Sequence, residues 1–151
     1  MAIDRSWIGR SFPKHTVEVV PSQLRFFANT IGETNPIYVD EQAAKEAGYP
    51  GILAPPTYGF SLKLAIDDPF RYYREMGVDL HKLLHSRQKF EYAGQICSGD
   101  RLEVTTTILD IYDRRRGAIE FVDEETTAVN QHNELVSRQF TKLIVRNGAS
   151  S

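Results

Sequence analysis

Two side chains in one polar loop could take part in proton transfer. The loop runs from Glu33 to Val39 and contains the carboxylate of Glu33 and, five positions later, the phenol of Tyr38. A carboxylate can act as a general base, whereas an ordinary tyrosine titrates near pH ~10 and keeps its proton at neutral pH. We therefore treat Glu33 as the candidate base and Tyr38 as a hydrogen-bonding or packing residue.

Residues that bind metals or act as nucleophiles are scattered along the chain. There are four histidines and one cysteine, Cys97, and His15, His81 and His132 lie near the ends of predicted elements without ligand-like spacing. One cysteine can form neither an internal disulfide nor a thiolate cage. We expect no metal site, no redox cofactor, an inert Cys97 and a reducing, cytoplasmic location.

Length and composition fit one ordinary globular domain. The chain has 151 residues, a formal net charge of −2, 41% hydrophobic and 25% charged residues. We expect a single domain over residues 1–151, with a frayed tail from about residue 147. Charges of both signs are interspersed, which argues against a broad nucleic-acid surface. No apolar run approaches the ~20 residues of a membrane-spanning helix, and the amino terminus lacks a signal-peptide core.

Three helices are predicted before about residue 79. The first follows Pro21 and stops at Gly32, because apolar residues repeat there with helical spacing: Leu24, Phe27, Ala28 and Ile31. The second is short and runs from a cap at Asp40 to Gly48. The third begins after Pro55-Pro56 and continues to Ile66. Since it is apolar on nearly every side, it must be buried.

Strand-like segments dominate from Leu83 onward. Turn signals separate them at Cys97–Asp100, Arg114–Gly117 and Asn130–Asn133. Short turns imply antiparallel neighbours, and a first strand is expected near His15–Val19. The fold class is therefore α+β, with an antiparallel sheet wrapped around the third helix.

Two further features of these strands are assigned structural roles. His85 is expected to be structural and to face the side opposite Gln88. Arg114–Gly117 predicts a charged hairpin turn, with contact to the phosphates of coenzyme A or to an acidic carrier protein as the alternative.

The order of these elements and four motifs together resemble the MaoC-like hydratase/dehydratase family of hot-dog folds. The likeness runs from about residue 5 to 146 and is carried by these motifs and the segment that follows the first of them: Gly32–Asp40, Ala44–Tyr49, Gly51–Thr57, Leu84–Tyr92 and Ser98–Leu102. Within the family the chain looks most like FAS1-type amino-terminal dehydratase domains and the small subunits of bacterial (R)-3-hydroxyacyl thioester dehydratases. The resemblance implies paired hot-dog units with an acyl thioester in the cleft between them. It also implies reversible addition of water to a trans-2-enoyl thioester, giving the (R)-3-hydroxyacyl form.

The chain departs from the family pattern at each catalytic position. In active members an Asp and a His five positions later transfer protons, and a glycine amide in an Ala-His-Gly segment binds the thioester oxygen. Here Glu33 takes the Asp position, Tyr38 takes the His position, and Pro55-Pro56 takes the His-Gly positions. Because proline has no backbone N–H, the usual amide donor is missing unless Thr57 or Tyr58 supplies one. Three losses in one site indicate that this chain does not carry out the standard hydration alone.

Several functions remain open. The chain is an acyl-binding half of a dehydratase whose catalytic Asp and His lie on a second hot-dog chain, or a homodimeric hydratase with Glu33 as base. It could instead be a non-catalytic acyl-coenzyme A-binding or scaffold protein, with thioesterase activity less favoured. The ligand would be an acyl thioester of coenzyme A or acyl carrier protein. The candidate catalytic residues are Glu33 and Tyr38, and the candidate substrate-binding residues are Asn35, Pro56, Thr57 and Tyr58.

Overall fold

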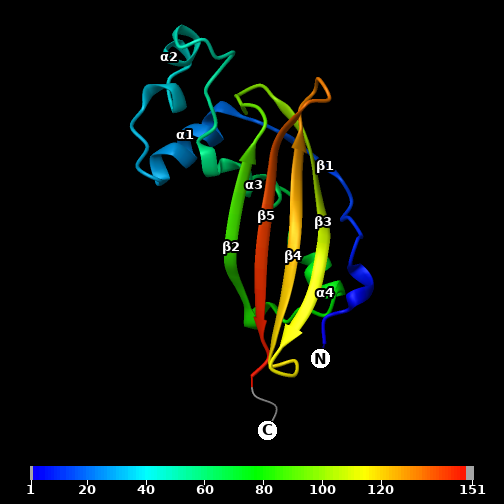
Figure 1. The fold of residues 1–151 in the computed structure, drawn as a ribbon. Helices are drawn as coiled ribbons and strands as arrows, with labels where there is room; N and C mark the ends of the chain where they lie inside the picture. The colour runs from blue at the N-terminus through cyan, green and yellow to red at the C-terminus, as the bar shows by residue number, and fades with distance from the viewer. Residues whose placement is uncertain (1, 149–151) are drawn as a thin grey trace.

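A five-stranded antiparallel sheet dominates the computed structural model, which describes residues 2–148 (Figure 1). The sheet order is β1-β3-β4-β5-β2. The strands are β1 (His15–Glu18), β2 (Leu83–Tyr92), β3 (Arg101–Arg114), β4 (Ile119–Val129) and β5 (Leu135–Arg146). Adjacent strands β3, β4 and β5 are joined by the turns expected from the sequence. The α+β prediction is confirmed.

Short helical segments occupy one face and one end of the sheet. The α-helices are α1 (Pro21–Thr30), α2 (Glu41–Glu46), α3 (Gly59–Leu62) and α4 (Arg71–Glu75). The 3₁₀ turns are η1 (Arg5–Trp7), η2 (Pro36–Tyr38), η3 (Pro56–Tyr58) and η4 (Leu80–Lys82). Helices α1 and α2 form a lobe that projects beyond β2 at one end of the sheet, and we call this lobe the overhang (Figure 1).

The first two predicted helices are confirmed. Helix α1 buries Leu24 and Ala28, two members of the apolar stripe. Helix α2 begins after Asp40, whose carboxylate accepts a hydrogen bond from the Ala43 amide at 2.7 Å. That bond satisfies one of the free amides of the first turn.

The third helix is shorter than the sequence predicts. Turn η3 leads directly into α3, which ends at Leu62 rather than at Ile66. The Leu62 carbonyl accepts a hydrogen bond from His15 Nε2 at 2.8 Å, and the next amides bond three residues back, Leu64 to Ser61 and Ala65 to Leu62. A tertiary partner therefore takes the carbonyl near the end of the helix, and the chain tightens into 3₁₀-like turns.

The interior consists of two apolar clusters. The upper cluster lies toward the overhang and includes Val17, Val19, Leu24, Ile52, Tyr58, Leu62, Leu102, Val104, Ala128 and Val136. The lower cluster includes Ile3, Tyr73, Met76, Val78, Ile108, Ile111, Val122, Leu143 and Val145. Strand β3 passes through both clusters, since it supplies Val104 to one and Ile108 to the other.

A polar belt crosses the inner face of the sheet between the two clusters. Its members are all buried: Thr106, Glu124, Thr126, Gln139 and Thr141. Thr106 and Thr126 hydrogen-bond each other at 2.9 Å. Glu124 forms an ion pair with Lys63 and accepts a hydrogen bond from the Tyr73 hydroxyl at 2.6 Å. Burial and the Glu124 charge raise the pKa of Tyr73 well above its ordinary value.

The orientation of His85 differs from the prediction. A register shift between His85 and Arg87 adds one residue to β2 relative to its partner β5. Such a bulge breaks the alternation of faces. His85 Nε2 consequently lies 3.2 Å from Gln88 Oε1, and its ring stacks on Phe60 with centroids 5.3 Å apart. The prediction that His85 faces the side opposite Gln88 is wrong.

Both ends of the described chain are fixed to the sheet. Ile3 donates its amide hydrogen to Glu120 Oε1 at 2.8 Å, and Asn147 bonds Glu120 Oε2 at 2.7 Å. The expected frayed tail falls mainly on residues 149–151, which lie outside the described residues. Within residues 2–148, no helix combines the length and apolar character needed to cross a membrane.

Candidate functional site

A largely apolar cleft lies between the loop that carries Tyr38, the start of α3, and the ends of β2 and β5 nearest the overhang. Its volume is about 160 Å³. The lining residues are Tyr38, Leu53, Ala54, Pro55, Pro56, Gly59, Phe90, Tyr92, Gly94, Gln95, Ile96 and Ser137. Small-molecule pockets usually enclose about 300–1,000 Å³. The cleft of one chain is therefore smaller than a typical small-molecule pocket.

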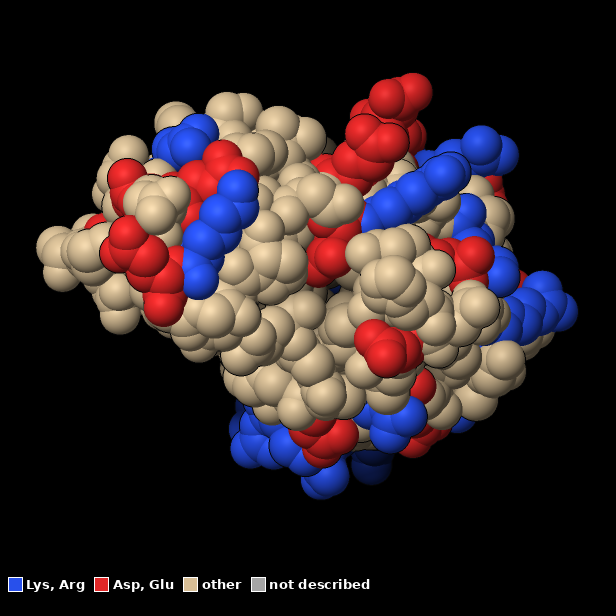
Figure 2. Space-filling view, turned by 90° about the horizontal axis from the view of Figure 1, so that it is seen from above, with Lys and Arg blue, Asp and Glu red and all other residues tan. Residues whose placement is uncertain are grey.

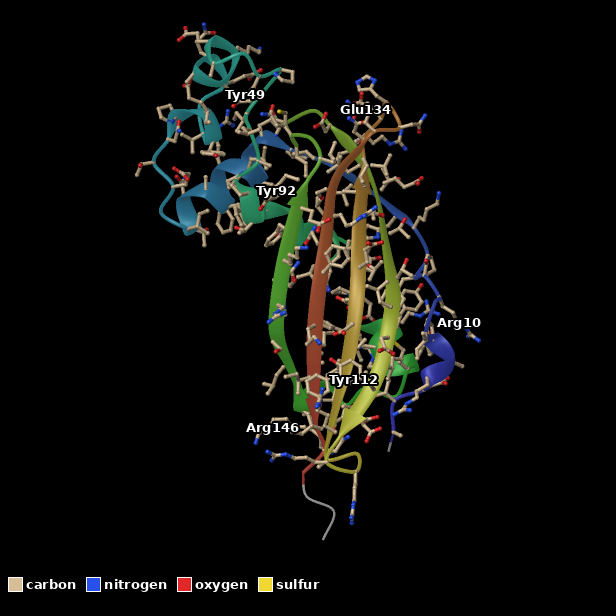
Figure 3. All side chains as sticks on the ribbon, in the orientation of Figure 1. Arg10, Tyr49, Tyr92, Tyr112, Glu134 and Arg146 are labelled. Atoms are coloured by element: carbon tan, nitrogen blue, oxygen red, sulfur yellow. The ribbon has the colours of Figure 1, made fainter. Side chains whose placement is uncertain are left out.

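Aromatic side chains of β2 form one wall of the cleft. The rings of Phe90 and Tyr92 stack in parallel with centroids 6.0 Å apart. The Tyr92 hydroxyl donates a hydrogen bond to the Pro56 carbonyl at 2.8 Å, which ties β2 to η3 across the cleft. Tyr92 lies at the overhang end of the sheet, whereas Tyr112 and Arg146 lie at the opposite end (Figure 3).

The cleft has little capacity for proton transfer. Among the lining residues within 2–148 there is no Asp, Glu, His, Lys, Arg or Cys. Burial raises the pKa of both Tyr38 and Tyr92, and the nearby Glu33 charge raises that of Tyr38 further. Both phenols therefore remain protonated at neutral pH, where they act as hydrogen-bond donors and not as bases.

Glu33 and Asn35 lie in the loop beside the cleft and do not line it. Glu33 Oε1 accepts hydrogen bonds from the amides of Thr34 at 2.8 Å and Asn35 at 2.9 Å. Asn35 caps η2 by accepting a hydrogen bond from the Ile37 amide at 3.2 Å. Both side chains hold the shape of the loop that carries Tyr38 into the cleft.

The residues predicted around the start of the third helix separate into three environments. Pro56 lines the cleft, and Thr57 is exposed. Tyr58 is 5% exposed and packs edge-on against Phe27 with centroids 5.5 Å apart, so its ring lies in the upper cluster. The Tyr58 amide donates to the Pro55 carbonyl at 2.9 Å and is already occupied. Of the six predicted site residues, the cleft brings together Tyr38 and Pro56.

Sequence reasoning missed Ser137, which lies at the inner end of the cleft. Its side chain is 2% exposed, and its hydroxyl has no hydrogen-bond partner within residues 2–148. Ser137 belongs to the inward-facing set of β5 that continues with Gln139, Thr141, Leu143 and Val145. The sequence of β5 shows that alternate residues share one face. Because three residues of the inward face are polar, hydropathy does not reveal which of the two faces points inward.

Charged side chains are mixed in sign on the face seen from above (Figure 2), and the candidate metal ligands are dispersed within residues 2–148. Seen from above, Lys and Arg are interspersed with Asp and Glu, and no single-sign region dominates this face (Figure 2). The hairpin turn at Arg114–Gly117 joins β3 and β4 at the end of the sheet opposite the overhang (Figure 1). Residues 2–148 contain no group of three His, Cys, Asp or Glu residues placed to hold a metal ion. Burial raises the pKa of the Cys97 thiol to about 11.

Comparison with known proteins agrees with the fold. Residues 6–139 match the family described as "FAS1-like, dehydratase domain region". The UPF0336 protein of Streptomyces coelicolor is 37% identical over 152 aligned residues, which cover 97% of each protein.

Two solved structures of dehydratases have a similar fold. A chain of the HadBC (3R-hydroxyacyl-ACP dehydratase) complex from Mycobacterium tuberculosis is 26% identical, with a TM-score of 0.76 over 91% of this chain and 96% of that chain. A MaoC-like dehydratase has a TM-score of 0.82 at 20% identity, over 93% of this chain and 42% of that chain. The sheet order, the helix at its inner face and these matches show that the chain has the hot-dog fold and belongs to the FAS1-like dehydratase domain family.

Proposed function

We propose that this chain is an acyl-thioester-binding subunit of a hydratase/dehydratase and that a second hot-dog chain supplies the proton-transfer groups. The observation that carries the proposal is the composition of the cleft. Its described lining is apolar and aromatic, and it includes no carboxylate, imidazole or amine. Such a surface binds a hydrocarbon chain by burying apolar area, but it offers no general base for reversible hydration.

The start of the third helix supports a binding role in preference to a complete catalytic site. Hydration of an enoyl thioester develops negative charge on the thioester oxygen, and backbone amides aimed at that oxygen stabilise it. Pro56 has no amide hydrogen, and the Tyr58 amide is bonded to the Pro55 carbonyl. Neither position 56 nor the Tyr58 amide is therefore available to stabilise this charge, and the Thr57 amide is the remaining candidate in η3.

An open sheet edge supports the need for a second chain. Strand β2 is an edge strand, with β5 on one side and no neighbouring strand on the other within residues 2–148. An edge strand presents unpaired backbone groups that can pair with another chain. Because Phe90 and Tyr92 of β2 also form the cleft wall, a partner paired there would lie beside the cleft. The HadBC protein, which has the same fold, is a complex.

The ligand class follows from the same features. The proposed ligand is a trans-2-enoyl or (R)-3-hydroxyacyl thioester carried by coenzyme A or by acyl carrier protein. The reaction would take place in the cytoplasm, where a lone free cysteine such as Cys97 stays reduced. The proposed partner is either a second copy of this chain or a different hot-dog subunit.

The proposal is tested by comparing the purified chain alone with the chain co-expressed with a hot-dog subunit that has the intact Asp-x-Asn-Pro-x-His pattern. Crotonyl-coenzyme A and longer trans-2-enoyl thioesters serve as substrates, and loss of the enoyl absorbance reports hydration. We expect binding without turnover for the chain alone and turnover for the pair. Hydration by the chain alone that is lost in Glu33→Gln would overturn the proposal and support a homodimeric hydratase.

Two matched substitutions test whether the acyl thioester binds in the cleft. Leu53→Asp places a charge in the cleft lining, and Leu109→Asp places the same charge on β3, where Leu109 is 44% exposed and outside the cleft. We expect the first variant to lose thioester binding and the second to retain it. Equal binding by both variants would show that the acyl group binds elsewhere.

A further inference from the structure

Ser137 is a buried polar group whose hydrogen-bonding capacity is unused. The side chain is 2% exposed, contributes to the cleft lining, and has no hydrogen-bond partner within residues 2–148. Most buried side-chain polar atoms in proteins have a partner, so an exception calls for an explanation. An apolar cleft whose inner end has one unpaired hydroxyl is suited to a ligand that brings an oxygen to that point.

The neighbours of Ser137 are already committed to other bonds. Gln139, the next inward-facing residue of β5, donates from Nε2 to the Gly59 carbonyl at 2.7 Å and accepts at Oε1 from Gln88 at 3.1 Å. Opposite Ser137 in the β4–β5 register lies Ala128, which has no polar side-chain atom. The surrounding protein thus holds Ser137 in place without using its hydroxyl.

The approach to Ser137 depends on a glycine. Gly59 is buried at the start of α3, and a Cβ built on it would lie 4.0 Å from Ser137 Oγ and 3.0 Å from Gln139 Nε2. A side chain at this position would crowd the inner end of the cleft. The hydroxyl lies close to the first turn of α3, just after Pro56, which has no amide hydrogen to donate.

We propose that the Ser137 hydroxyl donates a hydrogen bond to an oxygen of the bound acyl thioester and so acts as a specificity residue. This inference rests on the proposed thioester-binding function. The acceptor is either the thioester carbonyl oxygen or an oxygen on carbon 3 of the acyl group, and both have the same hydrogen-bond chemistry. A purely hydrocarbon segment placed over Ser137 would leave the buried hydroxyl without a hydrogen bond, which disfavours that binding pose.

The test measures the dissociation constants of two ligands by titration calorimetry with the full chain. Butyryl-coenzyme A has only the thioester oxygen, whereas (R)-3-hydroxybutyryl-coenzyme A has the thioester oxygen and a 3-hydroxyl. Ser137→Ala removes the hydroxyl from the cleft. Thr127→Val removes a hydroxyl of β4 that faces away from the inner side of the sheet and serves as the matched control. Circular dichroism confirms that each variant is folded.

We expect Ser137→Ala to weaken binding by roughly 3- to 10-fold, the effect of one net hydrogen bond, while Thr127→Val binds like the wild type. Equal weakening for both ligands assigns the acceptor to the thioester carbonyl, and weakening confined to the 3-hydroxy ligand assigns it to the 3-hydroxyl. If Ser137→Ala binds both ligands with dissociation constants within twofold of the wild-type values, the proposed role of Ser137 is refuted, whereas the proposed thioester-binding function is not. Failure of the wild-type chain to bind either ligand would refute the proposed function as well.

Discussion

Removing one partner of the buried ion pair between Lys63 and Glu124 should severely destabilise the protein. The side chain of Lys63 is 9% exposed and that of Glu124 is fully buried. Lys63→Met would leave the Glu124 carboxylate with the Tyr73 hydroxyl as its remaining partner. Breaking a buried pair in this way typically costs about 3–5 kcal/mol, because an uncompensated charge stays buried. That loss is a large part of the roughly 5–15 kcal/mol that stabilises a typical domain.

The cost of Lys63→Met should depend on pH. An unpaired buried carboxyl has a pKa above its value in the unfolded chain, so the folded state holds the proton more strongly. The variant should therefore be most stable below the unfolded pKa of about 4.3 and should lose stability as the pH rises above it.

The double variant Lys63→Met/Glu124→Leu distinguishes the charge effect from lost packing. Replacing both members of a buried ion pair by apolar residues is often neutral or stabilising. We expect the double variant to be markedly more stable than either single variant. Lys14→Met, which removes one partner of the exposed Lys14–Glu103 pair, is the control and should change stability by less than about 1 kcal/mol.

Urea unfolding followed by the fluorescence of Trp7, the single tryptophan, measures these effects. Thermal midpoints should fall by about 2–4 °C for each kcal/mol lost in a chain of this size. Each single variant could instead lose less than about 1 kcal/mol of unfolding free energy, with the two losses adding up in the double variant. That result would show that the two charges are not coupled and would refute the prediction.

Three further predictions concern stability and are checked by urea unfolding. Gly51→Ala should destabilise the fold by about 1–3 kcal/mol, because its Cβ would lie 2.4 Å from Ser98 Oγ, which is held by the Ile52 amide at 2.9 Å; an unchanged midpoint would contradict this close approach. Asp40→Ala should cost about 0.5–2 kcal/mol by removing the cap of α2, whereas the exposed neighbour Gln42→Ala should cost less. Because burial raises the pKa of Cys97 to about 11, the unfolded chain releases the thiol proton first as the pH rises. Stability should therefore fall between about pH 9 and pH 11, and Cys97→Ala should lessen that fall; identical pH profiles for the two proteins would rule out this thiol as a contributor.

Local sequence signals were sufficient for most of the secondary structure. The alternation in β3, the apolar stripe of α1 and the Asp40 cap act over a few residues and appear in the structure as expected. The end of α3 was not predictable in this way. It depends on His15 and on the Lys63–Glu124 pair, whose partners are 47 and 61 residues away in sequence. The bulge that turns His85 inward likewise has no local turn residue to signal it.

The site was less predictable than the fold because four separate segments build it. Tyr38, Pro56, Phe90 and Ser137 meet in the cleft only after the sheet has formed. Resemblance to a family identified the first two positions, since they fall in recognisable motifs. Ser137 lies in a strand where threonine, glutamine and serine occupy the inward face, and hydropathy alone gives no orientation for such a segment.

The division of the interior by the polar belt has a consequence for cooperativity. Helix α1 of the overhang is anchored by Leu24 in the upper cluster, whereas Ile3 and α4 contribute to the lower cluster. Proteins open in contiguous units whose free energies lie below that of global unfolding. We expect the overhang to detach from the sheet while the lower cluster stays intact, so amide hydrogens of α1 should exchange with solvent through a partial opening. Exchange of the β4 amides beside Val122 should instead require loss of the lower cluster, which makes that half of the hot-dog the last part to unfold.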